Sequence, residues 1–245
     1  MTLLDADQKI ELDDVLGEDT WELFEVIEDS FGIDLGDYRS LCGMSVAELA
    51  NKVRERTTYP VSEICLSAAA FYRLRRAFVI AIGLPRKEIH PSTQIAKYLP
   101  WWRRSRTLWQ SIEQSLELKM PNLVPPRWAF FVALILPAAL MLCLRRFLGL
   151  PLSAFMIFAG SVLLTFPAMA ALVPAARVLP PTGETFGGLA KIVLARNHAA
   201  FASHCGGSSE KDVLLSLRQI VAGEVGVSIE EITPEVRVPQ DLNIY

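Results

Sequence analysis

Three side chains near residue 200 are of types that bind metal ions. His198, His204 and Cys205 offer imidazole and thiolate ligands of the kind that zinc prefers. Their spacing puts them on no common helical face with a fourth ligand, so we expect them, like His90, to be loop residues. The sequence therefore predicts no metal site.

Other catalytic patterns are weak. The chain has no serine, histidine and aspartate in an order that indicates a nucleophile with its base. The glycine pairs at 187–188 and 206–207 lack the strand and helix that a phosphate-binding loop requires. We expect no enzyme activity. Four widely spaced cysteines favour reduced thiols in a cytosol-facing protein: Cys42, Cys65, Cys143 and Cys205.

Charge is distributed unevenly along the 245 residues, although the formal net charge is only −3. Residues 1–57 hold 15 acids and 5 bases, and residues 209–245 hold 7 acids and 3 bases. Residues 58–120 are opposite in sign, with 4 acids and 10 bases. A basic stretch between acidic ends does not fit a nucleic-acid-binding protein, so nucleic acid is not expected as a partner.

A long apolar segment covers residues 128–176, where Arg145 and Arg146 are the only charged residues. Because an arginine at the centre of a bilayer costs about 2.5–3.5 kcal/mol, we expect both in a tight turn. The sequence then predicts a two-helix transmembrane hairpin in the inner (cytoplasmic) membrane, with both chain ends in the cytoplasm. A hairpin buried in a soluble core and a re-entrant hairpin are the alternatives.

The chain outside this segment contains internal repeats. Each repeat pairs two amphipathic helices, or two helix ends with the glycine and Ile-x-Pro loop that follow. In the segment 45–56, Ser45 and Glu48 form a capping box. The matching segments are 83–91 with 226–234, 23–33 with 108–118, and 45–56 with 185–196.

In this order the segments resemble the acyl carrier protein family. In that family a first helix ends in a glycine and an Ile-x-Pro loop, an acidic second helix ends in Phe-Gly-Ile, and a last helix begins Thr-Val-x-x-Leu. The resemblance implies an all-α fold with two small helical bundles. The corresponding pieces are 210–242, 17–35 and 44–57 in one copy, and 66–82, 104–118 and 184–197 in the other.

The order of these pieces along the chain is unusual. The N-terminus supplies the second and last helices of one bundle, and the C-terminus supplies its first helix and loop. Because a helix of about 14 residues is marginal alone in water, we expect the two ends to form one circularly permuted bundle, within one chain or by exchange of ends in a homodimer. A tail helix that lies elsewhere is the alternative. The expected boundaries are 1–57 completed by 209–245, then 60–124, 128–176 and 181–200.

Carrier proteins attach phosphopantetheine to a serine at the start of the second helix. The equivalent positions here are Gly17 and Trp102, which have no hydroxyl. Thr20 and Ser105 are the nearest hydroxyls in the two copies. The resemblance therefore implies a degenerate carrier-like protein without a cofactor.

Surface charge gives the candidate interaction sites. In carrier proteins the acidic second helix binds basic enzymes, so the resemblance implies a docking face formed by Glu18, Asp19, Glu22, Glu25, Glu28 and Asp29. An ordinary solvated helix face is the alternative. The basic middle copy extends over 73–106 and either contacts anionic headgroups or receives the acidic bundle. Its candidate headgroup contacts are Trp101, Trp102, Arg103, Arg104 and Arg106.

The sequence as a whole predicts a noncatalytic docking or scaffold protein anchored to the membrane. Its expected partners are the lipid bilayer and an unidentified protein. Two rival functions stay open: a genuine carrier modified at a nonstandard hydroxyl such as Thr20, and an accessory subunit of a membrane transporter or enzyme.

Overall fold

The computed structural model describes residues 18–99, 106–123, 127–147, 159, 161–166, 179, 183–238 and 240–242. Within these residues the fold is helical, and β-bridges occur only singly, without strands. The expected all-α class is confirmed. The elements are α2 (Glu18–Phe31), η1 (Tyr38–Ser40), α3 (Val46–Arg56), α4 (Leu66–Ile82), η2 (Arg86–Glu88), η3 (Ile95–Lys97), α5 (Arg106–Leu116), α6 (Arg127–Phe147), α8 (Phe186–Arg196), α9 (His198–Cys205), α10 (Glu210–Val225) and η6 (Gln240–Leu242).

The chain packs into two compact units. The first comprises Met1–Gln94, Ser111–Pro121 and Pro181–Tyr245, and the second comprises Ile95–Gln110 and Asn122–Pro180. Helices from both copies of the repeat contribute to the first unit, whereas α6 belongs to the second.

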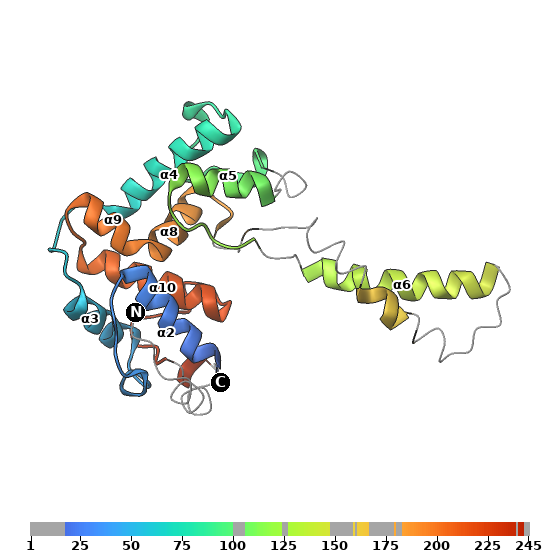
Figure 1. Cartoon of the computed structure of the whole chain (residues 1–245), viewed down its shortest axis with the longest axis horizontal. Helices are drawn as coiled ribbons and strands as arrows, with labels where there is room; N and C mark the ends of the chain where they lie inside the picture. Colours follow the sequence, from blue (N-terminus) through green and yellow to red (C-terminus); the bar gives the residue numbers. More distant parts are fainter. Residues whose placement is uncertain are drawn as a thin grey trace. The chain divides into compact units, whose positions relative to one another are not determined.

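Opposite ends of the chain share one hydrophobic core in the first unit. Figure 1 shows α2 (blue) and α10 (red) side by side, and α3 packs on α10 as well. Phe24 and Ile27 of α2, Leu49 of α3, and Leu217 of α10 are completely buried in this core, and Ile220 is nearly so. The expected association of the two chain ends is thus observed within a single chain. It covers the apolar stripe of α10, which would otherwise face water.

The loops after α4 and α10 return to the last helix of each copy in the same way. Each offers two backbone carbonyls to the N–H groups at the start of that helix, which have no partner inside it. An antiparallel bridge follows in both copies, Gln94 with Thr185 and Arg237 with Ser45. The carbonyls and their donors, at 2.8–3.0 Å, are Pro91 with Gly187 and Thr93 with Phe186, and Pro234 with Ala47 and Val236 with Val46.

The helices α2 and α5 also end alike. Gly32 follows α2 with a φ of 62°, and Glu117 occupies the same left-handed region after α5 with a φ of 56°. The Oε1 atom of Glu28 accepts the backbone N–H of Leu35 at 2.5 Å, and Oε1 of Glu113 accepts the backbone N–H of Met120 at 3.1 Å. In both copies the donor lies seven residues after the glutamate. The repeat found in the sequence is therefore a repeat of hydrogen bonds.

Both glycine pairs lie where two segments of backbone approach closely. A Cβ atom at Gly187 would lie 2.9 Å from the carbonyl oxygen of Pro91. A Cβ atom at Gly207, whose φ is 141°, would overlap the carbonyl oxygen of Pro60. Only glycine allows these approaches without moving the neighbouring chain.

Two expectations about local structure are wrong. Residues 198–205 form helix α9 and not a loop, although His90 does lie exposed in a loop. α6 continues to Phe147, so Arg145 and Arg146 lie in the helix rather than in a tight turn. Leucine and arginine are good helix formers, and the next proline, Pro151, comes after the helix has ended.

The expected hairpin over 128–176 is described only in part. α6 contains Pro137, and of the expected second helix only residues 159 and 161–166 are described, as helical; the remainder lies outside the described residues. Over the part of the chain that the structure covers, no helix combines the length and hydropathy needed to cross a bilayer.

Candidate docking face

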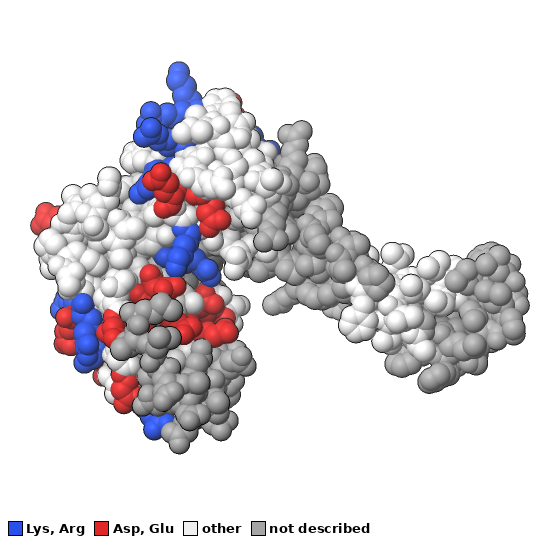
Figure 2. Space-filling model, in the orientation of Figure 1, with Lys and Arg blue, Asp and Glu red and all other residues white. Residues whose placement is uncertain are grey.

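The exposed acids of α2 lie opposite its buried side. Leu23, Phe24 and Ile27 are in the core, while Glu22 and Glu25 are exposed. Residues three or four apart lie on the same side of a helix, so Glu22 and Glu25 share one side. Figure 2 shows acidic side chains gathered over the region of α2 and α10. We call Glu22 and Glu25 the acidic face.

Glu28 belongs to the frame of the bundle and not to this face. Besides the backbone N–H that its Oε1 accepts, its Oε2 accepts the Tyr38 hydroxyl at 2.7 Å. Burial, and next this hydrogen bond to Glu28, raise the pKa of the Tyr38 hydroxyl, which therefore stays a proton donor. Both carboxylate oxygens of Glu28 are thus used inside the protein.

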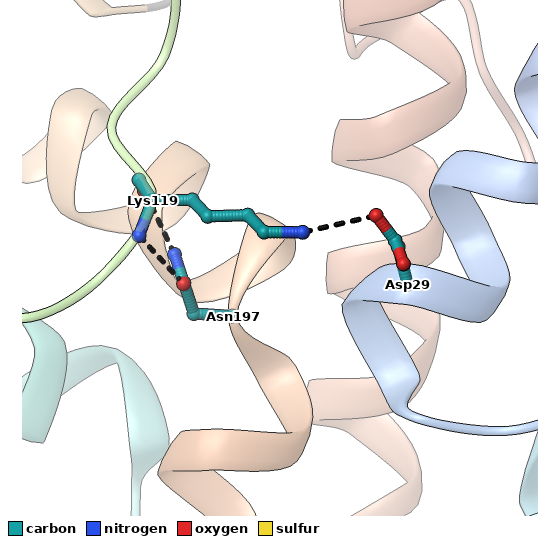
Figure 3. A network of polar contacts seen from close by, with 3 residues as sticks. All are labelled: Asp29, Lys119 and Asn197. Atoms are coloured by element: carbon teal, nitrogen blue, oxygen red, sulfur yellow. Dashed lines mark hydrogen bonds and ion pairs between the residues drawn. The ribbon is translucent and has the colours of Figure 1, made fainter.

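Asp29 is already paired within the chain, as Figure 3 shows. Its Oδ2 lies 2.9 Å from Nζ of Lys119 in the segment after α5. The Asn197 side chain holds the Lys119 backbone by two hydrogen bonds of 2.8 Å, one accepted and one donated. Because both charged side chains are exposed, their attraction contributes little, whereas the Asn197 amide fixes the position of the lysine. One acid of α2 therefore pairs with a lysine of the 60–124 segment.

Most of the remaining predicted site residues lie outside the described residues. These include the serine-equivalent positions Gly17 and Trp102, and the side chains of Glu18 and Asp19. The same holds for Trp101, Arg103 and Arg104, and for the side chain of Arg106, which begins α5.

A buried polar cluster that the sequence did not predict joins α9 to α10. Nδ1 of His198 lies 2.8 Å from the Ser216 hydroxyl, and Nε2 lies 2.8 Å from the Ser208 hydroxyl. The imidazole is fully buried, with the Phe31 ring 4.6 Å away between centroids. Burial lowers the pKa of His198 to about 4, so the ring is neutral near pH 7.

The geometry excludes the metal-ligand role that His198, His204 and Cys205 could have shared. Both nitrogens of His198 are engaged by serines, and His204 is exposed. In the described ranges no three His, Cys, Asp or Glu side chains come together to hold a metal ion. No sequence signal marks Ser208 and Ser216 as its partners, because only the fold brings them to it.

The exposed carboxylates of Glu22 and Glu25 give this side of α2 a negative charge. The acidic face can pair with cations on a partner. The imidazole of His198 is completely buried, so solvent does not reach it. No protein-family model matches the chain, and no curated protein or solved structure matches it either. The proposals below therefore rest on the chain's own residues.

Proposed function

We propose that this chain is a noncatalytic docking protein, built on two acyl-carrier-like repeats and attached to the cytoplasmic side of the inner membrane. The observation that carries the proposal is the repeated frame. In both copies the loop after the first helix caps the last helix, and a glutamate closes the end of the second helix. This frame supports the resemblance because the repeats match in hydrogen bonds as well as in residue types.

The carrier chemistry of the family is not part of the proposal. Thr20, the hydroxyl nearest to the carrier serine position in the first copy, is completely buried. An enzyme that esterifies a hydroxyl must reach it from solvent. We expect the intact mass to stay unchanged after co-expression with a phosphopantetheinyl transferase, with a known carrier protein modified in parallel. A pantetheine-sized mass increase would return the chain to the carriers.

Docking is assigned to the acidic face and a basic protein partner. Glu22 and Glu25 are exposed side by side along α2, whereas Glu28 and Asp29 are engaged within the chain. Replacing Glu22 and Glu25 by glutamine should reduce the amount of cross-linked basic partner recovered with the full-length protein. The matched control removes the same charge from the exposed residues Glu63 and Glu184. Equal recovery with both variants would remove the docking face from the proposal.

Membrane attachment is assigned to α6. One side of this helix carries large apolar residues that are more than a third exposed, and Phe131 and Ile135 are 63% and 62% exposed. Soluble surfaces seldom expose so continuous an apolar stripe, which favours contact with lipid. The stripe consists of Phe131, Val132, Ile135, Leu136, Leu140 and Leu142.

Flotation with vesicles of phosphatidylcholine alone tests this attachment. Burial of an isoleucine or leucine side chain contributes about 1.5–3 kcal/mol, so Ile135→Asn with Leu136→Asn should lower vesicle binding at least about a hundredfold. The control is Val61→Asn with Ile64→Asn, two exposed apolar residues of the first unit. If the α6 variant floats as well as wild type, attachment by α6 is wrong.

A further inference from the structure

The outward side of α4 combines apolar and cationic residues without any acid. Tyr72, Arg76 and Ile80 follow one another at intervals of four residues, so they lie along one face of the helix. All three are exposed, Tyr72 by 57% and Ile80 by 63%. The opposite side of α4 is in the core, through residues such as Leu74 and Phe78.

Arg75 extends this outward side, and its counterpart in the other copy shows why it is available. Arg218, at the matching position of α10, donates its Nη2–H to the Ile229 carbonyl at 2.9 Å and its Nε–H to the Ile232 carbonyl. Arg75 instead lies over the Tyr72 ring, 5.0 Å from its centroid. Arg218 therefore supports the loop of its own copy, whereas Arg75 lies over the exposed ring of Tyr72.

Two further cations continue the face beyond the end of the helix. Gly83 ends α4 in a left-handed conformation, and the exposed residues Arg86 and Lys87 follow in η2. Figure 2 shows basic side chains gathered over this end of α4. Within the part of the chain that the structure describes, none of these four cations forms an ion pair, whereas Arg73 pairs with Glu117 at 3.8 Å. We call Tyr72, Arg75, Arg76, Ile80, Arg86 and Lys87 the α4 cationic face.

We infer that the α4 cationic face binds anionic lipid headgroups. Arginine forks match phosphate oxygens, and cations near an anionic leaflet gain about 1 kcal/mol each. Tyrosine and isoleucine on the same side fit the boundary between headgroups and acyl chains. An acidic protein surface would pair the cations but would leave these apolar side chains without a matching layer. The inference rests on the proposed membrane attachment, because α6 would keep the first unit close to the bilayer.

The test compares full-length protein on phosphatidylcholine vesicles with the same vesicles containing phosphatidylglycerol. Wild type should bind the anionic vesicles more tightly, and added salt should reduce the difference. Arg76→Gln with Lys87→Gln should lose about fivefold per cation, roughly thirtyfold in all, on anionic vesicles only. The control removes the same charge from Arg39 and Lys211, which are exposed elsewhere in the first unit. Ile80→Gln tests the apolar part without a change of charge.

The outcomes separate this inference from the proposed function. If wild type binds both kinds of vesicle equally, or if the control variant loses as much as Arg76→Gln with Lys87→Gln, the inference is overturned while attachment by α6 stands. If the preference for anionic vesicles persists but binding to neutral vesicles is absent, the α4 cationic face is supported and attachment by α6 fails. If the variant instead loses self-association in sedimentation without vesicles, the face belongs to a second copy of the chain.

Discussion

The buried His198 makes the stability of this protein depend on pH in a defined direction. Its pKa is about 4 in the folded protein because of burial, against 6.5 for an exposed histidine. Between these values the unfolded chain binds a proton that the folded chain does not, so unfolding is favoured as the pH falls. The stabilisation is complete above pH 6.5 and is lost as the pH decreases toward 4.

The two pKa values set the size of this effect. Linkage gives a loss of about 1.4 kcal/mol on going from neutral pH to pH 5.5 and about 3 kcal/mol at pH 4. Such a loss is a large part of the 5–15 kcal/mol typical of natural domains. The physical origin is the cost of placing an imidazolium among Phe31, Ser208 and Ser216, where no carboxylate hydrogen-bonds to the ring.

The assay is urea unfolding of wild type and His198→Gln from pH 7.5 to 4.5, followed by circular dichroism. The variant should be less stable at neutral pH but should lose the titrating contribution, so the difference between the two proteins should shrink as the pH falls. His90→Gln, at an exposed loop position, controls for the removal of a histidine as such. A constant difference between wild type and His198→Gln across this pH range would refute the reasoning.

Four further predictions concern backbone geometry and thiol reactivity. In thermal unfolding, Gly207→Ala should destabilise the protein by about 2 kcal/mol or more, because φ is 141° and the backbone of another segment lies against it. Gly223→Ala, in open space on α10, should stabilise the protein by about 0.5–1 kcal/mol in the same assay. Glu117→Gly should raise the free energy of unfolding by about 0.5–1 kcal/mol by relieving the left-handed conformation, and a decrease would show that its pairing with Arg73 matters more. Iodoacetamide should alkylate Cys65 faster than half-buried Cys42. The hydrogen bond with Ser67 and the backbone N–H of Ala68 lower the pKa of Cys65, whereas burial and then Asp37 raise the pKa of Cys42. Site-resolved mass spectrometry measures both rates, and equal rates at the two thiols would contradict this.

Helices with local stop and start signals could be predicted well from the sequence. The helix expected over 66–82 is α4 with the same bounds, because Gly83 supplies the left-handed residue that ends it. The last helices, expected over 44–57 and 184–197, lie within two residues of these bounds, because Ser45 and Thr185 accept N–H groups in the first turns of α3 and α8. The signals in these cases lie within a few residues of the feature that they determine.

The misread helix α9 had local signals as well. Ala199, Ala200 and Ala202 favour a helix, and Gly206 after Cys205 is a typical helix end. The helix has no clear apolar stripe, because Phe201 is the one large apolar side chain among its buried residues His198, Phe201 and Ala202. These signals were available in the sequence, although His198, His204 and Cys205 were expected in a loop.

Individual side-chain contacts between distant segments could not be predicted. Lys119 and Asp29 are separated by 90 residues, and the two serines around His198 are 10 and 18 residues away from it. Nothing in their types marks them as partners. The structural role of Glu28 could have been inferred, since a glutamate, Glu113, stands at the matching position of the other copy. An acid repeated in both copies, when the copies differ in overall charge, indicates the frame rather than a binding surface.

Features that both copies share and features that differ between them have different roles in the chain. The two copies share half-buried glutamates, capped last helices and returning loops, so these features fold the chain and cannot distinguish one copy from the other. They differ where side chains are exposed, with acids on α2 and cations on α4. Had the two bundles evolved only to bind each other, these charges would be consumed between them; instead Asp29 is paired with Lys119 while Glu22 and Arg76 remain exposed. Opposite charges on separate faces of one unit suit the proposed basic partner and the proposed anionic surface.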